Sequence, residues 1–248
     1  MAQGQGKYLY AVIENGDEER FGPVGIKGAE VYTLAGGGVS AVVSDAPAGK
    51  LRPERRNLAA HHAVLKMLTE RGAVLPVSFG TVADDPSVLR GFLKGNAETF
   101  KEQLRRVEGR VEMGLKIRWD VADFFEYFVH RHPPLAAARD RLFAGGGDPS
   151  HEERIELGRL FDRLLEEDRK ALADRVEDIL ASRRFEVKRS PSRNEREVMN
   201  LACLVERDRE QEFEETVFEA AKLFDDHFAI DYSGPWAPYN FVSIEGGF

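Results

Sequence analysis

The stretch from residue 111 to 119 sets the strongest limit on the fold, because apolar side chains alternate there with polar or small ones. The apolar positions are Val111, Met113, Leu115, Ile117 and Trp119. Successive side chains of a β-strand point to opposite faces of its sheet, so this pattern predicts a strand with one buried face. Other parts of the chain must cover that face, and the fold must therefore combine a sheet with helices.

The chain that follows contains candidates for both the cover and the partner strands. Helical spacing predicts a helix over residues 121–129, and Pro133-Pro134 prevents it from continuing. A second helix is predicted from Asp148-Pro149 to about Ser182, and a third over 211–224. Strands are predicted at residues 185–188, 198–206 and 228–232, and the Gly145-Gly146-Gly147 run marks a flexible connection. The order strand, helices, strand, strand, helix, strand favours a ferredoxin-like, split βαβ domain over residues 109–248.

The first 108 residues are predicted to form a smaller α+β domain that includes a linking helix. Three strands are expected at residues 7–14, 30–34 and 39–44, with a loop through Gly22 to Gly28 and a turn at Gly36-Gly37-Gly38. A helix over 53–71, a strand over 73–82 and one helix from Asp85-Pro86 to about Gly109 follow. The whole chain is therefore predicted to be an α+β protein of two domains.

Charge and hydropathy exclude several classes of protein. The formal net charge is -8, which disfavours a nucleic-acid partner because such binding rests on clustered Lys and Arg. The short basic run at residues 52–56 is interrupted by Glu54 and is interpreted as a solvated face. The start of the chain resembles no secretion signal, and no stretch approaches the roughly 18–20 apolar residues that span a bilayer. With one cysteine, the chain is predicted to be cytoplasmic.

No combination of residues predicts catalysis, a metal or a cofactor. Neighbouring helical positions point about 100° apart, so His61 and His62 cannot readily share one ion. His62 falls on the expected apolar stripe and is predicted to be a packed core residue, whereas His61 is predicted to lie at the surface or an interface. Cys203 lies in an apolar stretch and is predicted to be buried and inert. We therefore expect no enzyme.

Six blocks of sequence in a fixed order resemble the gas vesicle protein F/L family, GvpF/GvpL. They are KYLYAVIE at 7–14, VSAVVSDAP at 39–47, HHAVLKMLTERGAVLPVSFGTV at 61–82, VEMGLKIRWD at 111–120, NLACLVERD at 200–208 and GPWAPYNFV at 234–242. The chain departs from the family pattern at Ser78, where Arg is common, and at Ala237, where Pro is common. The first departure removes a cation from the block, and the second loosens the closing turn.

The resemblance implies a non-enzymatic accessory or minor structural protein of gas vesicles, located at the vesicle within the cytoplasm. It implies the hydrophobic shell protein GvpA as the partner, with other accessory gas vesicle proteins as further partners, and a two-domain fold whose second domain is ferredoxin-like. The competing expectation is a regulatory protein that binds a small ligand, since ferredoxin-like domains often bind metabolites where strands meet helices.

The closing stretch GPWAPYNFV carries the candidate partner-binding residues Trp236, Tyr239 and Phe241. Proline restricts the backbone on both sides of Trp236, so an ordered segment would lose little further entropy. Two roles are open from the sequence. The aromatics can fill grooves on the protein itself as a clamp, or they can form a docking surface for the partner.

Overall fold

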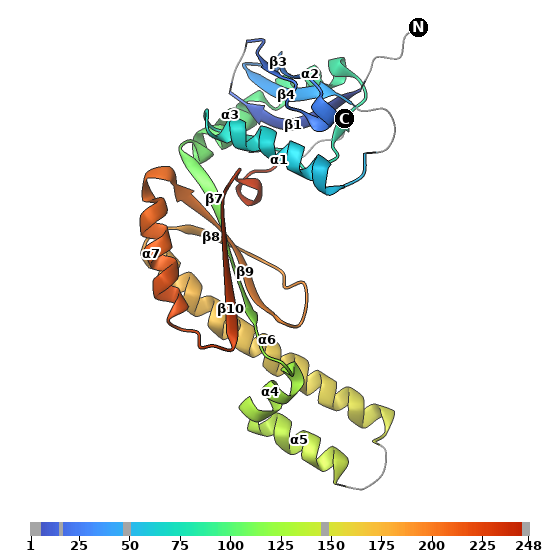
Figure 1. The fold of residues 1–248 in the computed structure, drawn as a ribbon, viewed down its shortest axis with the longest axis vertical. Coiled ribbons are helices and arrows are strands. Elements are labelled where there is room, and N and C mark those ends of the chain that lie inside the picture. The colour runs from blue at the N-terminus through green and yellow to red at the C-terminus, as the bar shows by residue number, and fades with distance from the viewer. Residues whose placement is uncertain (1–5, 15–16, 47–50, 145–148, 245–248) are drawn as a thin grey trace. The chain divides into compact units, whose positions relative to one another are not determined.

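The computed structural model describes residues 6–14, 17–46, 51–144 and 149–244. The chain is an α+β protein with two antiparallel sheets. It groups into two compact units, the first made of Met1–Met113, Leu204–Asp208 and Gly234–Phe248, and the second of Gly114–Cys203 and Arg209–Ser233 (Figure 1). The division into domains 1–108 and 109–248 stays a prediction. The contacts group the closing segment from Gly234 with the first unit.

The sheet of the first unit has the strand order β2-β3-β4-β1-β5, and β6 also pairs with β1. Its strands are β1 (Lys7–Ile13), β2 (Arg20–Gly22), β3 (Val31–Gly36), β4 (Val39–Asp45), β5 (Leu75–Pro76) and β6 (Val82–Ala83). The three predicted opening strands are confirmed. The predicted strand over 73–82 is wrong in extent, since only its two ends pair with β1, and β2 lies where a loop was predicted.

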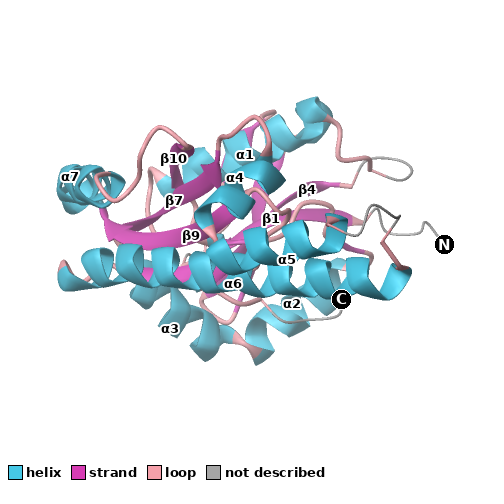
Figure 2. Cartoon of the chain, turned by 90° about the horizontal axis from the view of Figure 1, so that it is seen from below, coloured by secondary structure: helices cyan, strands magenta, loops and turns pink. Residues whose placement is uncertain are grey.

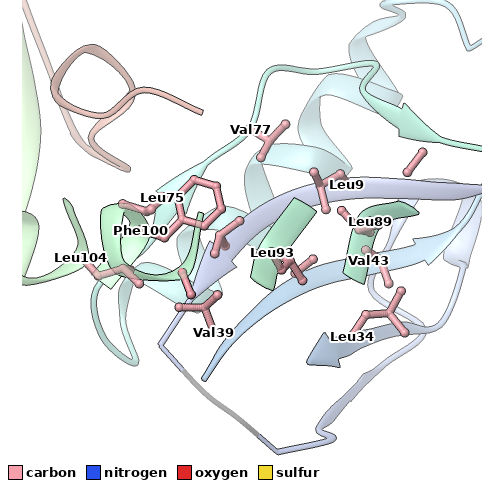
Figure 3. Packing of buried hydrophobic residues seen from close by; sticks show 14 of the residues in the cluster. Leu9, Leu34, Val39, Val43, Leu75, Val77, Leu89, Leu93, Phe100 and Leu104 are labelled. Carbon is pink, nitrogen blue, oxygen red and sulfur yellow. The ribbon is translucent and has the colours of Figure 1, made fainter. Parts of the chain in front are cut away.

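Helices cover both faces of this sheet. α1 (Arg55–Thr69) contributes Val64, Leu65 and Leu68 to the cluster on one face. α2 (Pro86–Gly95) and α3 (Ala97–Val107) supply the cluster on the other face, where Leu93 packs near Val43 (Figure 3). The prediction of one continuous helix over this region is wrong. Asn96 leaves the helical backbone at φ -111 and ψ 10, and its side chain donates to the carbonyl of Phe92.

A β-bulge in β1 decides which side chains face α1. Leu9 pairs with Val43 and Ala11 with Val42, so β1 carries one more residue than β4 over this stretch. As a result Tyr8, Tyr10 and Ala11 all lie in the cluster on the α1 face, while Leu9 lies in the opposite cluster. Tyr8 and Tyr10 share the α1 face by ordinary strand alternation, and the bulge adds Ala11 to that face.

The second sheet has the strand order β10-β7-β9-β8. Its strands are β7 (Arg110–Trp119), β8 (Glu186–Ser190), β9 (Glu197–Glu206) and β10 (Phe228–Trp236). The alternating strand is confirmed: its five apolar side chains are buried, and the Trp119 ring lies 5.3 Å from the rings of Phe124 and Phe128. The aromatic helix predicted from the sequence is part of the cover.

In the described part of the second unit the α-helices are α4 (Phe124–Arg131), α5 (Pro133–Phe143), α6 (His151–Ser182) and α7 (Glu210–Ala221). α5 lies along the first half of α6 (Figure 2). The start of α6 differs from the prediction, because Ser150 and Glu153 form a capping box there. Asp148 and the predicted connection Gly145-Gly146-Gly147 lie outside the described residues, with Gly145 to Asp148 as the gap.

Candidate partner-binding groove

The closing part of the chain, residues 234–244, packs along the first unit, and we call it the C-terminal segment. Ala237 and the ring of Tyr239 join the cluster on the α1 face of the first sheet. Val242 and Ile244 pack against the cluster on the α2 and α3 face. The short helix η3 (Tyr239–Phe241) lies between these two contacts. The C-terminal segment therefore holds both helical layers of the first unit together.

Polar contacts fix the segment as firmly as the apolar ones. The carboxylate of Glu112, which is only 8% exposed, accepts from the backbone N–H and the side-chain amide of Asn240, each at 2.7 Å. On α3, the Gln103 amide exchanges two hydrogen bonds with the backbone of Ser243. Because a buried carboxylate needs partners, Glu112 and η3 stabilise each other.

A chain of hydrogen bonds runs through His61 beneath the segment. The N–H of Gly80 donates to the Tyr8 hydroxyl at 3.1 Å, and that hydroxyl lies 2.9 Å from His61 Nδ1. His61 Nε2 lies 3.0 Å from the hydroxyl of Tyr239, which donates to the carbonyl of Val77 at 3.5 Å. All four hydrogen bonds can form together if the Tyr8 hydroxyl donates to Nδ1 of His61 and the Nε2–H of His61 donates to the Tyr239 hydroxyl. This assigns the His61 proton to Nε2.

Burial keeps His61 neutral in this network. The imidazole is fully buried, and the loss of solvent lowers its pKa to about 4, with a smaller effect from the neighbouring His62. Burial also raises the pKa of Tyr8 to about 12 and raises that of Tyr239. The three groups therefore stay uncharged at neutral pH, and they act as structural hydrogen-bonding groups.

The predicted roles of the two histidines are reversed. His61 is the buried core residue, and His62 is exposed with its ring edge-on to Trp236 at 6.1 Å. The buried positions of α1 are Asn57, His61, Val64, Leu65 and Leu68. These positions follow helical spacing, but on a stripe one position away from the predicted one. The hydrogen bonds of His61 to Tyr8 and Tyr239 turn this stripe inward, and Ala59 and Ala63 are left on the exposed surface of α1.

That surface forms one wall of a groove of about 600 Å³ within the first unit. α1 contributes Ala59, His62, Ala63, Leu65, Lys66, Thr69 and Glu70, the C-terminal segment contributes Gly234, Pro235, Trp236, Ala237 and Tyr239, and Glu112 and Arg207 complete the lining. Arg207 donates to the carbonyl of Thr69 at 2.8 Å, so it closes the groove beside the end of α1. The groove is concave and has a largely apolar floor.

The three predicted site residues have different surroundings. Trp236 is 45% exposed at the wall of the groove. The ring of Tyr239 is partly buried, and its hydroxyl bonds to His61, while Phe241 is 2% exposed and packs inside the first unit. Sequence reasoning missed the α1 side of the groove, because Ala59, Ala63 and Lys66 carry no motif.

The architecture matches solved structures of gas vesicle proteins. The crystal structure of GvpF from Anabaena sp. PCC7120 matches with a TM-score of 0.80 and 27% identity, covering 98% of this chain and 100% of that one. In sequence, gas vesicle protein F of Streptomyces sp. (strain CB03234) is 29% identical over 95% of this chain and 98% of its own length. Gas vesicle protein L of the same strain is 32% identical over 96% and 93%.

The model of the family described as "Gas vesicle synthesis protein GvpL/GvpF" matches residues 6–243 of this chain. The chain therefore belongs to the GvpF/GvpL family, whose members are non-enzymatic proteins of gas vesicle formation. This confirms the family indicated by the six blocks. Among the described residues, no helix is both long and apolar enough to cross a bilayer.

Proposed function

We propose that this protein takes part in gas vesicle formation by binding the hydrophobic shell protein GvpA in the groove between α1 and the C-terminal segment. The observation that carries the proposal is the exposure of Trp236 at the wall of an apolar concave surface. A half-exposed Trp beside a groove is typical of the residues that dominate binding energy at interfaces. The family places the chain among gas vesicle synthesis proteins.

The physical need for such binding follows from the partner. A subunit that presents apolar surface to a gas must pass through water before assembly, and exposed apolar surface aggregates there. A carrier with a net charge of -8 stays soluble while its groove covers part of that surface. Both the protein and GvpA would then be located at the gas vesicle within the cytoplasm, where other accessory gas vesicle proteins can also bind.

The rigidity of the groove supports this role. Tyr239, Asn240 and Phe241 hold the backbone after Trp236 in place through contacts inside the first unit. Before it, the chain is held in strand β10, which ends at Trp236. A preorganised wall loses little entropy when a partner binds. In this proposal Trp236 contacts GvpA directly, and Tyr239 and Phe241 position it.

A binding assay tests the proposal. Purified protein is titrated against GvpA kept soluble as a fusion, and Trp236→Ala is compared with the wild type. We expect saturable binding that weakens at least about tenfold in the variant, the size of effect that loss of a central aromatic produces. Absence of wild-type binding, under conditions where another accessory gas vesicle protein binds GvpA, would reject the proposal.

The competing small-ligand function is supported by one observation. The groove volume of about 600 Å³ lies within the range of roughly 300–1,000 Å³ that small-molecule pockets occupy. A rise in melting temperature with one member of a metabolite set, abolished by Trp236→Ala, would favour this function over shell-protein binding.

We further infer that the second sheet and its helices form a ferredoxin-like domain. The elements follow one another as β7, helices, β8, β9, α7 and β10. In the sheet, β9 lies between β7 and β8, and β7 lies between β9 and β10. Each helical crossover thus skips one strand, which is the split βαβ arrangement.

A further inference from the structure

The first turn of α1 carries a charge arrangement that does not favour its own helix. Arg55 and Arg56 occupy the first two helical positions, and the first turn has no acidic residue. The N-terminus of a helix has a partial positive charge, so arginines there are unfavourable. Glu54 occupies the capping position without forming a side-chain capping bond. Such a local conflict is expected at a site used for something other than stability.

Cations extend beyond these two arginines. Lys27 lines a small surface hollow together with Arg56 and Asn57. Of the cations here, Arg56 pairs with Glu54 at 2.8 Å. Within the described part of the chain, Arg52 and Arg55 form no ion pair. In a protein of net charge -8, this end of α1 is therefore a local positive surface.

The face of α1 that lines the groove from Ala59 onward continues back to Arg55 in the first turn. Arg55, Ala59, Ala63 and Lys66 are spaced by four, four and three residues, which places them on one face of a helix. All four are exposed. Two alanines therefore lie between two cations on this face. Arg55 and Lys66 are eleven residues apart, which at a rise of 1.5 Å per residue separates them by about 16 Å along the helix axis.

Among the described residues that line the groove, the acidic ones are Glu70 and Glu112. Glu70 lies beyond Lys66 and is exposed, while Glu112 is engaged by Asn240. Arg207 lies near Glu70 and donates to the Thr69 carbonyl. Glu54, next to Arg55, pairs with Arg56. Arg55, one turn before the groove, and Lys66 therefore offer positive charge at both ends of the stretch with Ala59 and Ala63.

We propose that the groove takes an amphipathic α-helix whose apolar stripe is flanked at both ends by carboxylates. Large apolar side chains of this helix would fill the space above Ala59 and Ala63, against the ring of Trp236. Its carboxylates would pair with Arg55 at one end and Lys66 at the other, so charge complementarity sets its position along α1. This inference rests on the proposed binding of GvpA and states the chemistry of the segment that is recognised.

Two synthetic helical peptides provide the probe. Both peptides have the same apolar stripe. At the two ends of the stripe, eleven positions apart, one peptide has two glutamates and the other has two lysines. Binding to the full chain is followed by fluorescence, since Trp119 is 1% exposed and Trp236 is the exposed indole. We expect the glutamate peptide to bind at least about tenfold more tightly at low salt, with a smaller difference at high salt.

Charge reversal in the protein completes the test. Arg55→Glu places an anion in the first turn of α1, so the variant is expected to melt at or above the wild-type temperature. Arg55→Glu with Lys66→Glu should reverse the preference between the two peptides. Arg175→Glu, an exposed change on α6 in the second unit, is the matched control and should leave the preference unchanged.

The outcomes separate the inference from the proposed function. Equal binding of both peptides, no binding of either, or a preference that survives the charge reversal would overturn the inference. GvpA binding that depends on Trp236 but is unaffected by Arg55→Glu would leave the proposed function standing and reject the carboxylate flanks. No GvpA binding by the wild type would reject the proposed function itself.

Discussion

His61 Nε2 lies 3.0 Å from the hydroxyl of Tyr239, although the two residues are 178 positions apart in the sequence. This hydrogen bond joins the buried face of α1 to the C-terminal segment. Both groups are neutral and shielded from water, so the bond is made in a setting of low dielectric. The position of Trp236 on the groove wall depends on contacts of this kind.

The first prediction concerns the Tyr239 hydroxyl. Tyr239→Phe leaves the Nε2–H of His61 buried without an acceptor, so we expect the free energy of unfolding to fall by about 1–3 kcal/mol. Urea denaturation followed by circular dichroism measures it. Tyr32→Phe is the control, because the Tyr32 hydroxyl bonds to Asp45 at the exposed surface. Equal losses in the two variants would contradict the buried network.

The second prediction concerns pH. The pKa of His61 is lowered to about 4 from its ordinary value of 6.5, so between these values the unfolded chain binds a proton that the folded protein excludes. Stability is unaffected by His61 above pH 6.5 and falls as pH drops from 6.5 toward 4, by ~3 kcal/mol in total. His61→Gln should lose this part of the pH dependence. Identical slopes for variant and wild type between pH 6.5 and 5 would exclude it.

The third prediction concerns the backbone at the start of the C-terminal segment. Gly234 has φ +131, and a Cβ there would lie 2.7 Å from the sulfur of Met113 and 3.0 Å from the carbonyl of Glu112. Gly234→Ala should therefore lower the melting temperature. Gly158→Ala, in the interior of α6 with open space around it, should raise stability by about 0.5–1 kcal/mol. A neutral Gly234→Ala would show that the segment is not held as described.

The fourth prediction distinguishes the aromatic residue of the C-terminal segment that stabilises the fold from the one that contacts GvpA. Phe241→Ala removes a ring that is 2% exposed and should cost about 3–5 kcal/mol of stability. Trp236→Ala removes a ring that is 45% exposed, so we expect stability to change by less than about 1 kcal/mol while GvpA binding weakens at least about tenfold. Thermal melts and binding titrations on both variants check this. A large stability loss for Trp236→Ala would assign the indole to the fold.

The hydrophobic periodicity of the sequence was sufficient to predict those helices and strands whose buried side chains follow a single regular pattern. The alternation ending at Trp119 gave the correct strand, and Phe124 and Phe128 gave its cover. The same reasoning failed in α1, because its two neighbouring stripes are both partly apolar. Only contacts with Tyr8 and Tyr239 decide that His61 is inside. Those contacts come from a strand and from a segment that lie far from α1 in the sequence, and the periodicity of α1 shows neither.

The candidate site was predictable in part for a similar reason. Aromatic content singled out Trp236, Tyr239 and Phe241, but residue type alone could not separate the exposed indole from the partly buried Tyr239 and the buried Phe241. Their burial is set by long-range partners such as Glu112, 128 positions from Asn240. The alanines of α1 become a groove floor only because the C-terminal segment lies beside them.

Hydrogen exchange of the backbone amides, measured with and without GvpA, tests whether GvpA binds in the groove. We expect added GvpA to slow exchange in α1 and at residues 236–237, and Trp236→Ala to abolish this protection. Proline amides are absent, so Pro235 and Pro238 give no signal. Protection confined to the second unit, or protection of α1 that persists in Trp236→Ala, would contradict the claim that GvpA binds in the groove.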